Sequence, residues 1–452
     1  MKRIFAALLS IIFLLLVIYN CKDEPPVIPP PPPEPKPKAA IYLQDKSCTE
    51  FWIRLELENF TLPVNVQLIK DNLLQTEING LSNKDTTLYI DSLLPNKAYN
   101  IIAVVSNNEQ QDTSSQLQAT TLDTTSHIFS YQTYELGEPL TGNSSILYDV
   151  ALIDANNIYA VGEIYIMDSL GQTILYNVVH WDGNDWELKK LTYQGIPPVI
   201  HTVFAVDEND IWFDPWFHWN GQNFQELPID PIFIGVGVNR MWGNSDGIYV
   251  VGNNGFIAHR NSNGQTWQQI SSGTELALID IYSKDGNEIY ISGAYTTETK
   301  GVLLKGNASG FSVMINSEII SENELFEKLY GELASVWVDD NGTIYTGGNL
   351  LFRYKNNQWN YETSLPENFI GGNPGTYYRG FITSIRGNAS NDYIIAGGRN
   401  TLKHFNGVSW EQIGIPYDSQ SPIIWGSVKM KNNTAVAVGL KNNSAYIILL
   451  NK

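Results

Sequence analysis

The sequence predicts an all-β protein, and three observations support this prediction. Apolar residues form runs of about four to seven, separated by turns rich in Gly, Asn and Asp, which tolerate the positive φ of tight hairpins. Aromatic residues make up 12% of the 452 residues and charged residues 17%, a composition typical of packed β-sheets and not of disordered chains. A pattern of about 40 to 50 residues also recurs from residue 128 onward. We therefore expect a small β-sandwich followed by a ring of repeated sheets.

The clearest copy of the repeat spans residues 238–270. Four short apolar runs, 238–242, 248–251, 256–259 and 266–270, are separated by turn residues, as in a four-stranded antiparallel meander. So small a sheet buries too little apolar surface to be stable alone. It must therefore pack against further copies of itself.

Six further copies share an Asn or Asp turn, an aliphatic residue, an aromatic residue and a later Gly, with some departures. The corresponding segments are 157–162, 210–213, 288–293, 343–347, 392–397 and 435–439. Most copies continue to an aromatic residue that opens the fourth strand, such as Trp186 or Trp410. We expect these aromatic residues to pack between neighbouring sheets.

The seventh copy lacks a fourth strand, and residues 131–136 resemble the missing one. An unpaired sheet edge promotes aggregation, and a closed ring removes it. We therefore expect the segment around Tyr134 to complete the seventh sheet and to close a seven-bladed β-propeller over residues 128–452.

The N-terminal 20 residues have the features of a signal peptide. Lys2 and Arg3 precede an apolar run, 4–18, that is too short and wrongly flanked for a spanning helix. Residues 18–21 resemble a bacterial lipobox, which implies removal of residues 1–20 and acylation of Cys21. Residues 22–24, Lys, Asp and Glu, look like the surface-export signal of Gram-negative lipoproteins. We expect a lipid-anchored protein at the outer membrane and cell surface; the periplasmic face and an uncleaved anchor are the alternatives.

A Pro-rich linker, 21–38, separates the lipid anchor from a β-domain at 39–122. Five consecutive prolines at 29–33 favour a stiff polyproline II segment. In the β-domain, Leu94 and Pro95 precede Tyr99 and an alternating strand. This pattern resembles the fibronectin type III signature, in which the Tyr forms a tyrosine corner. The resemblance implies a spacer or binding module, with Trp52 as the buried Trp of an early strand.

Two aromatic segments in the ring are candidate ligand sites, because loops on a rigid scaffold often bind ligands. Residues 212–219 contain five aromatic residues. Alternation places some in the core, and we expect the others to form a stacking surface for a sugar, with Trp216 and Trp219 as candidates. The insertion 363–380 ends in Tyr377, Tyr378 and Arg379, which suit a polar, ring-shaped ligand. Further insertions lie at 163–173 and 316–332, and the latter has a helix-like pattern.

Arg240 and Arg386 occupy innermost strands of their copies and are predicted to face the ring axis. Two inward arginines favour an anionic ligand, or they balance local carboxylates. Four histidines recur at equivalent positions, which favours a repeated structural role over a metal site; they are His180, His218, His259 and His404. Cys48 is the only cysteine besides Cys21, so neither a disulfide framework nor a Cys-x-x-Cys zinc site is expected. No cofactor is predicted.

The repeats also carry a resemblance to known proteins. The segments 241–244, 385–388 and 424–427 are similar to the I-W-G-(S/N) part of repeats in a group of bacterial lipoproteins, some labelled glucosyl transferase. The ring also resembles sialidase-like and photosystem-assembly-factor propellers. It contains no sialidase Phe-Arg-Ile-Pro motif and no nucleotide-binding βα unit that would support transferase chemistry.

The functional expectation combines these observations. A net charge of −19 opposes binding to nucleic acid. We expect a monomeric, non-catalytic surface lipoprotein that binds an extracellular glycan or protein through loops on one propeller face. The alternative is a carbohydrate-active enzyme, either a glycosyltransferase or a sialidase-like glycosidase.

Overall fold

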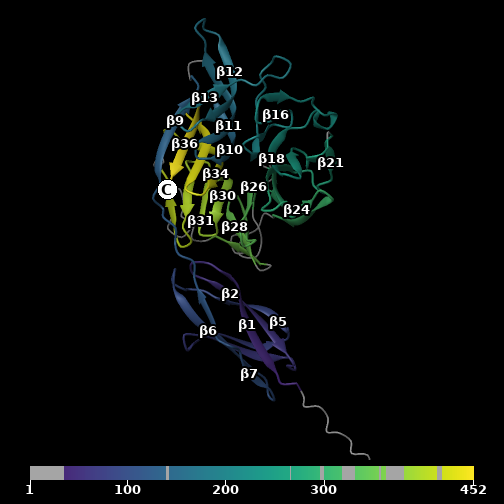
Figure 1. Cartoon of the computed structure of the whole chain (residues 1–452), viewed down its shortest axis with the longest axis vertical. Helices are drawn as coiled ribbons and strands as arrows, with labels where there is room; N and C mark the ends of the chain where they lie inside the picture. The colour runs from purple at the N-terminus through teal and green to yellow at the C-terminus, as the bar shows by residue number, and fades with distance from the viewer. Residues whose placement is uncertain are drawn as a thin grey trace, which may run out of the picture.

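A computed structural model describes residues 35–138, 142–264, 266–295, 300–317, 331–355, 358–362, 381–414 and 420–452. Within these ranges the chain is all-β, and the only helical turn is a short 3₁₀ segment, η2 (Pro231–Phe233). The molecule has two parts, a small sandwich and a larger ring of sheets (Figure 1).

The sandwich consists of two antiparallel sheets with strand orders β1-β2-β5 and β4-β3-β6, and both β7 and β8 pair with β6. Its strands are β1 (Lys38–Lys46), β2 (Phe51–Glu58), β3 (Val64–Lys70), β4 (Leu73–Leu81), β5 (Asp85–Ile90), β6 (Ala98–Ser106), β7 (Gln111–Thr113) and β8 (Leu117–Thr120). Alternate residues of β2 and β6, such as Ile53 and Ile101, are buried between the sheets. This alternation is the period-two pattern of a two-layer β-domain.

Tyr99 and Trp52 have different environments in the sandwich. The Tyr99 hydroxyl accepts a hydrogen bond from the Leu94 amide at 2.8 Å, so the residue forms the local contact expected of a tyrosine corner. Trp52 is buried, but it lies outside the sandwich core because its neighbours Phe51 and Ile53 point inward. Its ring packs instead against Tyr89 and the Lys355 amine.

Seven four-stranded antiparallel sheets follow, each a meander of consecutive strands. Sheets 1 to 3 contain β10 (Ile146–Asp154), β11 (Asn157–Met167), β12 (Thr173–Trp181), β13 (Trp186–Lys189); β14 (Val203–Asp207), β15 (Asp210–Phe213), β16 (Phe217–Trp219), β17 (Phe224–Glu226); and β18 (Val238–Asn244), β19 (Gly247–Gly252), β20 (Ile257–Asn261), β21 (Gln268–Ile270). Sheets 4 and 5 contain β22 (Ala277–Tyr282), β23 (Ile289–Tyr295), β24 (Lys300–Asn307), β25 (Gly310–Asn316); and β26 (Leu333–Val338), β27 (Ile344–Gly348), β28 (Leu351–Lys355), β29 (Gln358–Tyr361). Sheets 6 and 7 contain β30 (Ile382–Ala389), β31 (Asp392–Gly397), β32 (Leu402–Phe405), β33 (Trp410–Gln412); and β34 (Ile423–Lys431), β35 (Thr434–Lys441), β36 (Ser444–Asn451), with β9 (Ser130–Leu136) as the fourth strand.

The pairing of β36 with β9 confirms the predicted completion of the seventh sheet by an N-terminal segment. The register runs from Ala445 opposite Leu136 to Asn451 opposite Ser130. The first strand of each sheet contacts the first strand of the next, and β34 contacts β10. The seven sheets therefore surround a common axis.

Aromatic residues of the fourth strands pack as predicted. Trp186 lies 5.9 Å from Tyr134 of sheet 7, between ring centroids. Trp410 contacts Tyr393 of its own sheet and packs against the cluster that contains Trp337 and Tyr345 of sheet 5. Trp267 is buried but precedes β21 instead of opening it.

The sandwich contacts one face of the ring. Lys355 of β28 forms an ion pair with Asp45, and its amine lies 3.3 Å from the centroid of the Trp52 ring. Arg353 lies 3.5 Å from Glu50. Cys48 is a free, buried thiol at this junction; burial raises its pKa to about 11, which makes it a poor nucleophile.

These contacts define two faces of the ring. In an antiparallel meander, the first-to-second and third-to-fourth turns lie on one face, and the second-to-third turns and the links between sheets lie on the other. The sandwich and the link that follows it lie against the first kind of turn. Asp45 pairs with Lys355 at the end of β28, and the Asn391 side chain donates to the Asp123 carbonyl. We call this the proximal face and the opposite one the distal face. The β11–β12 hairpin extends from the distal face, at the end of the molecule away from the sandwich (Figure 1).

Candidate functional site

The first strands of the seven sheets share a sequence pattern that builds the axis. Each has an apolar residue, a variable residue, a polar residue and then Val, Ile or Met, as in Leu147 to Val150. In six sheets the pairing register shifts just before the polar residue, which marks a β-bulge. A bulge places two consecutive side chains on the same side of the strand, here the side that faces the axis. Each first strand therefore contributes three side chains to the axis, and the seven strands together form three layers.

The polar layer consists of the buried polar residues at the bulges: Asp149, Thr202, Arg240, Asp280, Ser335, Ser384 and Ser427. The distal layer contains the residue before each of these and lines a cavity of about 270 Å³: Tyr148, His201, Asn239, Ile279, Ala334, Thr383 and Gly426. The proximal layer lies two residues after each polar residue and lines a cavity of about 220 Å³: Ala151, Phe204, Trp242, Tyr282, Trp337, Arg386 and Lys429.

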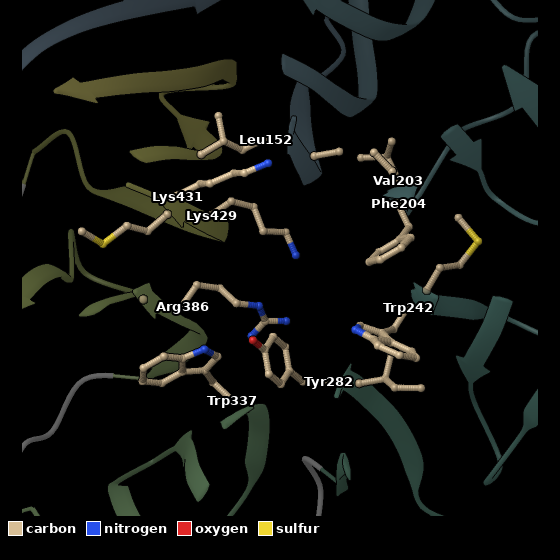
Figure 2. A pocket seen from close by; sticks show the side chains of 15 residues that line it. Leu152, Val203, Phe204, Trp242, Tyr282, Trp337, Arg386, Lys429 and Lys431 are labelled. Atoms are coloured by element: carbon tan, nitrogen blue, oxygen red, sulfur yellow. The ribbon is translucent and has the colours of Figure 1, made fainter. Parts of the chain in front are cut away.

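In the proximal layer, Phe204 and Trp242 lie across the cavity from Arg386 and Lys429, while Tyr282 and Trp337 lie next to Arg386 (Figure 2). Sheets 2 to 5 contribute Phe204, Trp242, Tyr282 and Trp337. Sheets 6 and 7 contribute Arg386 and Lys429, and the Lys429 amine points into the cavity. Burial, and then repulsion from Arg386, lower the pKa of Lys429 to about 8.

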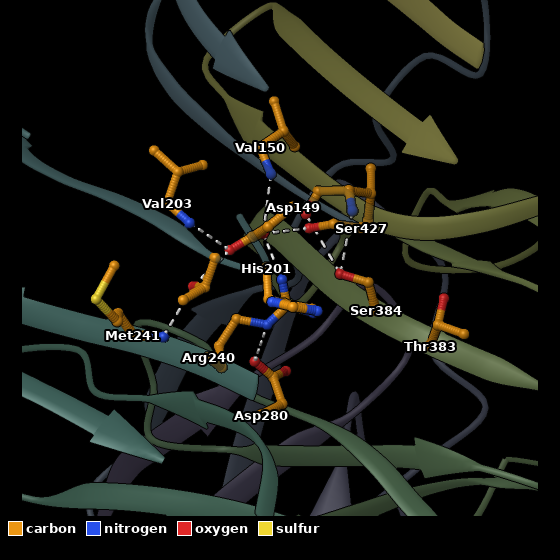
Figure 3. Close-up of polar contacts among 12 residues, drawn as sticks. Asp149, Val150, His201, Val203, Arg240, Met241, Asp280, Thr383, Ser384 and Ser427 are labelled. Carbon is orange, nitrogen blue, oxygen red and sulfur yellow. Dashed lines mark hydrogen bonds and ion pairs between the residues drawn. The ribbon is translucent and has the colours of Figure 1, made fainter. Parts of the chain in front are cut away.

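The charged groups of the polar layer are paired, partly with one another (Figure 3) and partly with Arg386 of the proximal layer. Arg240 forms an ion pair with Asp149, and its Nε lies 3.8 Å from Asp280 Oδ1. Asp149 also accepts hydrogen bonds from the Thr202 and Ser427 hydroxyls, at 3.0 and 2.9 Å. Burial alone raises the pKa of Asp149, but the charges of Arg240 and Lys429 and the hydrogen bonds from Ser427 and Val203 together outweigh it and hold this pKa below its usual range.

Asp280 has a second arginine partner. Arg386 NH1 and NH2 donate to its two carboxylate oxygens at 3.0 and 2.8 Å, and Ser335 Oγ donates at 2.7 Å. Burial again opposes ionisation, but Arg386 and then Arg240 lower the pKa of Asp280 to about 2. Both axial carboxylates are therefore charged and paired at neutral pH, and neither is a proton donor.

The polar layer also links neighbouring sheets around the full circle. At five of the seven junctions, the polar residue accepts a hydrogen bond from a backbone amide of the next sheet. These bonds run from Val203 to Asp149, Met241 to Thr202, Val336 to Asp280, Ile385 to Ser335 and Val428 to Ser384, at 3.0 to 3.2 Å. Arg240 to Asp280 and Ser427 to Asp149 supply the remaining two junctions. The polar layer therefore holds neighbouring sheets together in addition to pairing buried charges; we call it the belt.

The distal layer contains the aromatic pair Tyr148 and His201, whose rings stack at 5.2 Å between centroids. The Tyr148 hydroxyl donates to Glu163 at 2.6 Å, and Tyr165 donates to the other Glu163 oxygen at 2.7 Å. Burial, and then these contacts with Glu163, raise the pKa of Tyr148 well above its ordinary value. Burial lowers the pKa of His201, so this side chain is neutral at pH 7.

The ligand residues predicted from the sequence fall into separate places. Arg240 and Arg386 face the axis as predicted, but both guanidinium groups are paired with carboxylates. Trp216 precedes β16 and Trp219 ends it; both are half-buried, pack against Phe233 and Phe224 respectively, and line neither axial cavity. Tyr377, Tyr378, Arg379 and Cys21 lie outside the described residues, as does most of the helix-like stretch at 316–332.

The four recurring histidines make structural contacts of two kinds. His180 and His259 stack on Tyr159 and Tyr249, their cross-strand partners, at 4.2 and 4.1 Å. His218 and His404 each contact an aspartate, at 2.8 Å. Across the described ranges, no group of three or more His, Cys, Asp or Glu residues is arranged to hold a metal ion.

Sequence reasoning overlooked Asp149, Asp280 and Lys429. Aligning the first strands of the seven copies would have revealed them, because in most copies an apolar residue is followed two positions later by Asp, Ser or Thr. Asp149 and Asp280 occupy this polar position, and Lys429 lies two positions after it. The repeat is most regular in the second strands and the fourth-strand aromatics, which lie farther from the axis than these residues.

No family model matches the sequence, and no curated protein matches it. Similar solved structures include YCF48 bound to D1 peptide, with 14% identity, coverage of 71% of this chain and 94% of that one, and a TM-score of 0.49. RRP9 WD40 repeats share 12% identity over 71% of this chain and 100% of the other, with a TM-score of 0.48. The WD40 β-propeller domain of Doa1 shares 14% identity over 72% and 97%, with a TM-score of 0.45. None of these similarities identifies a ligand of this chain. In the part of the chain that the structure describes, no helix is long and apolar enough to cross a membrane.

Proposed function

We propose that this protein is a surface lipoprotein that binds a protein or glycan partner through the distal face of a seven-bladed β-propeller. The observation that carries this proposal is the position of the insertions. The β11–β12 hairpin lies on the distal side of the meander, opposite the sandwich. The described strand ends that flank two of the insertions lie on the same side: the ends of β25 and β29 and the starts of β26 and β30. Loops collected on one face of a rigid scaffold are a common arrangement for binding.

The sandwich serves as a spacer in this proposal. Its strand order and the bond from the Leu94 amide to Tyr99 support a fibronectin type III-like domain. The Asp45–Lys355 pair is largely buried, with side chains 13% and 10% exposed, and fixes the sandwich beneath sheets 5 and 6. Together with the Pro-rich linker, this arrangement holds the distal face away from a membrane to which Cys21 is attached.

The axial groups favour binding over catalysis. A glycosidase needs one carboxyl group that donates a proton and a second group that attacks or activates water. Asp149 and Asp280 are ionised and paired with arginines, so neither donates. Tyr148 keeps its proton because of its raised pKa, which makes it a poor nucleophile beside Glu163.

A matched pair of turn replacements tests the binding face. Replacing distal residues 168–172 by Asn-Gly should abolish binding to the partner found on an array of glycans and extracellular proteins, or weaken it roughly tenfold or more. The same replacement of 182–185, a proximal turn of the same sheet, should leave binding unchanged. Loss of binding only in the proximal variant would contradict the proposal. Hydrolysis or transfer on the arrayed glycans would instead support the carbohydrate-active enzyme.

Membrane attachment is tested at Cys21. Because a thioether-linked lipid requires the sulfur, Cys21→Ser should move the protein from the membrane fraction to the soluble fraction. Protease accessibility on intact cells, compared before and after Lys22→Ala with Asp23→Ala, measures surface display. Continued membrane association of Cys21→Ser would indicate an uncleaved N-terminal anchor.

A further inference from the structure

We propose that the proximal cavity binds a small carboxylate with a flat, apolar body, and that the Lys429 amine holds the carboxylate group. This site is independent of the proposed distal binding face, because the polar layer separates the two cavities.

The first observation is an unpaired cation. Among the described residues, the Lys429 amine has no hydrogen-bond or ion-pair partner, and it points into the proximal cavity (Figure 2). The two arginines of the axis are instead committed to Asp149 and Asp280. Three cations therefore face two carboxylates, which leaves one positive charge at the axis of a chain whose net charge is −19. A charge in such a partly desolvated position attracts an anion more strongly than one at the surface.

The second observation is the aromatic lining of the cavity. Phe204 and Tyr282 are half-buried, so parts of their rings face the cavity. Trp242 and Trp337 are 8% and 2% exposed and form the rest of the aromatic lining. Aromatic rings bind flat apolar groups by stacking or edge contacts. The cavity therefore offers an apolar side and a cationic side to one ligand.

The size of the cavity sets the size of the ligand. Its volume is about 220 Å³. An apolar cavity of about 150 Å³ is large enough for benzene, so this one has room for an aromatic ring with a carboxylate attached. All its lining residues belong to the ring, and the sandwich contributes none.

The protonation state of Lys429 suits this role at neutral pH. Its pKa of about 8 keeps most of the amine charged at pH 7 and neutral above pH 9. The groups facing it do not titrate in this interval, since Asp149 and Asp280 have lowered pKa values and the pKa of Tyr282 is raised, mainly by burial. Lys431 lies at the rim and donates to the Ile153 carbonyl at 2.7 Å.

Titration calorimetry with benzoate on the purified full-length protein tests the proposal. Saturable binding is expected at pH 7, with a Kd of about 1 mM or lower. Benzamide, which has the same shape without the charge, should bind roughly tenfold more weakly or worse. Benzoate binding should also weaken roughly tenfold or more at pH 9.5, where Lys429 is neutral.

Two variants distinguish Lys429 from its neighbour. Lys429→Met should abolish benzoate binding, whereas Lys431→Met should leave it unchanged. If Lys429→Met does not fold, the benzoate and benzamide comparison on the unaltered protein still decides. The proposal would be overturned if benzoate and benzamide bind equally well, or if Lys429→Met binds benzoate as the unaltered protein does. It would also be overturned if neither benzoate nor a peptide with a free C-terminus binds.

A further comparison shows whether the carboxylate belongs to a free small acid or to the C-terminus of a peptide. Acetyl-Gly-Phe with a free C-terminus, compared with its amide, tests the end of a peptide. Tighter binding of the free-ended peptide than of benzoate would identify a peptide terminus as the ligand, and the reverse order would identify a free acid.

Discussion

Replacing Asp280 by Ala is expected to lower the free energy of unfolding of the ring by about 3 to 5 kcal/mol. The substitution removes the carboxylate that pairs with Arg386 and leaves that buried guanidinium without its counter-charge. It also removes the acceptor of the Ser335 hydroxyl and the Val336 amide, and so opens the belt between sheets 4 and 5. Urea unfolding followed by tryptophan fluorescence measures this loss, because only Trp52 of the 12 tryptophans lies outside the ring.

A double variant separates the charge from the packing. Adding Arg386→Met to Asp280→Ala should restore part of the lost stability, since the unpaired buried cation is then gone. Asp85→Ala is the control, because it breaks an exposed pair with Arg54 and should change little. The contribution of Asp280 is present above the unfolded pKa and is lost as the pH falls through the folded pKa of about 2. A double variant less stable than Asp280→Ala would argue against the ion-pair explanation.

The stabilisation of the protein by Asp214→Asn is expected to be larger at pH 8.5 than at pH 5, by roughly 2 kcal/mol or more. Asp214 is fully buried, its Oδ2 has no partner within the described residues, and burial raises its pKa to about 7. Its Oδ1 accepts the His201 and Thr202 amides, which an amide oxygen also does. Asn also tolerates the positive φ of 49° at this position.

The sign of the pH effect follows from the raised pKa. The folded state favours protonated Asp214, so this residue contributes stability below the unfolded pKa and loses it as the pH rises through about 7. Asn carries no charge and is free of this loss. Asp154→Asn makes the same change at an exposed turn and controls for the altered net charge. An equal effect of Asp214→Asn on the urea midpoint at pH 5 and pH 8.5 would show that Asp214 is not the titrating group.

The sequence was informative wherever a local pattern determines the structure. The position of each sheet followed from alternating runs and turn residues, and the role of β9 followed from its likeness to other fourth strands. Tyr99 was found because the Leu-Pro spacing is itself local. In each case the informative residues either lie close together in the sequence or recur in several copies of the repeat.

The functional residues were harder to find because they meet only after the ring has formed. Asp280 and Arg386 are 106 positions apart, and nothing near either residue indicates its partner. Trp52 was predicted to be the buried Trp of an early strand; it is buried, but the sequence could not show that it contacts Lys355 of the ring. No local motif distinguishes Lys429 in the sequence, and only the convergence of seven strands places it beside Arg386 and the axial cavity.

The pairing of the N-terminal strand β9 with the C-terminal strand β36 has a consequence during synthesis. Residues 130–136 emerge from the ribosome about 300 residues before their hydrogen-bonding partner at 445–451. Throughout this interval the nascent chain carries an unsatisfied β-strand, which must be kept from pairing with other chains. The ring therefore closes only after residues 445–451 have been synthesised, and a chain that stalls before residue 445 keeps an unpaired strand and is a target for degradation.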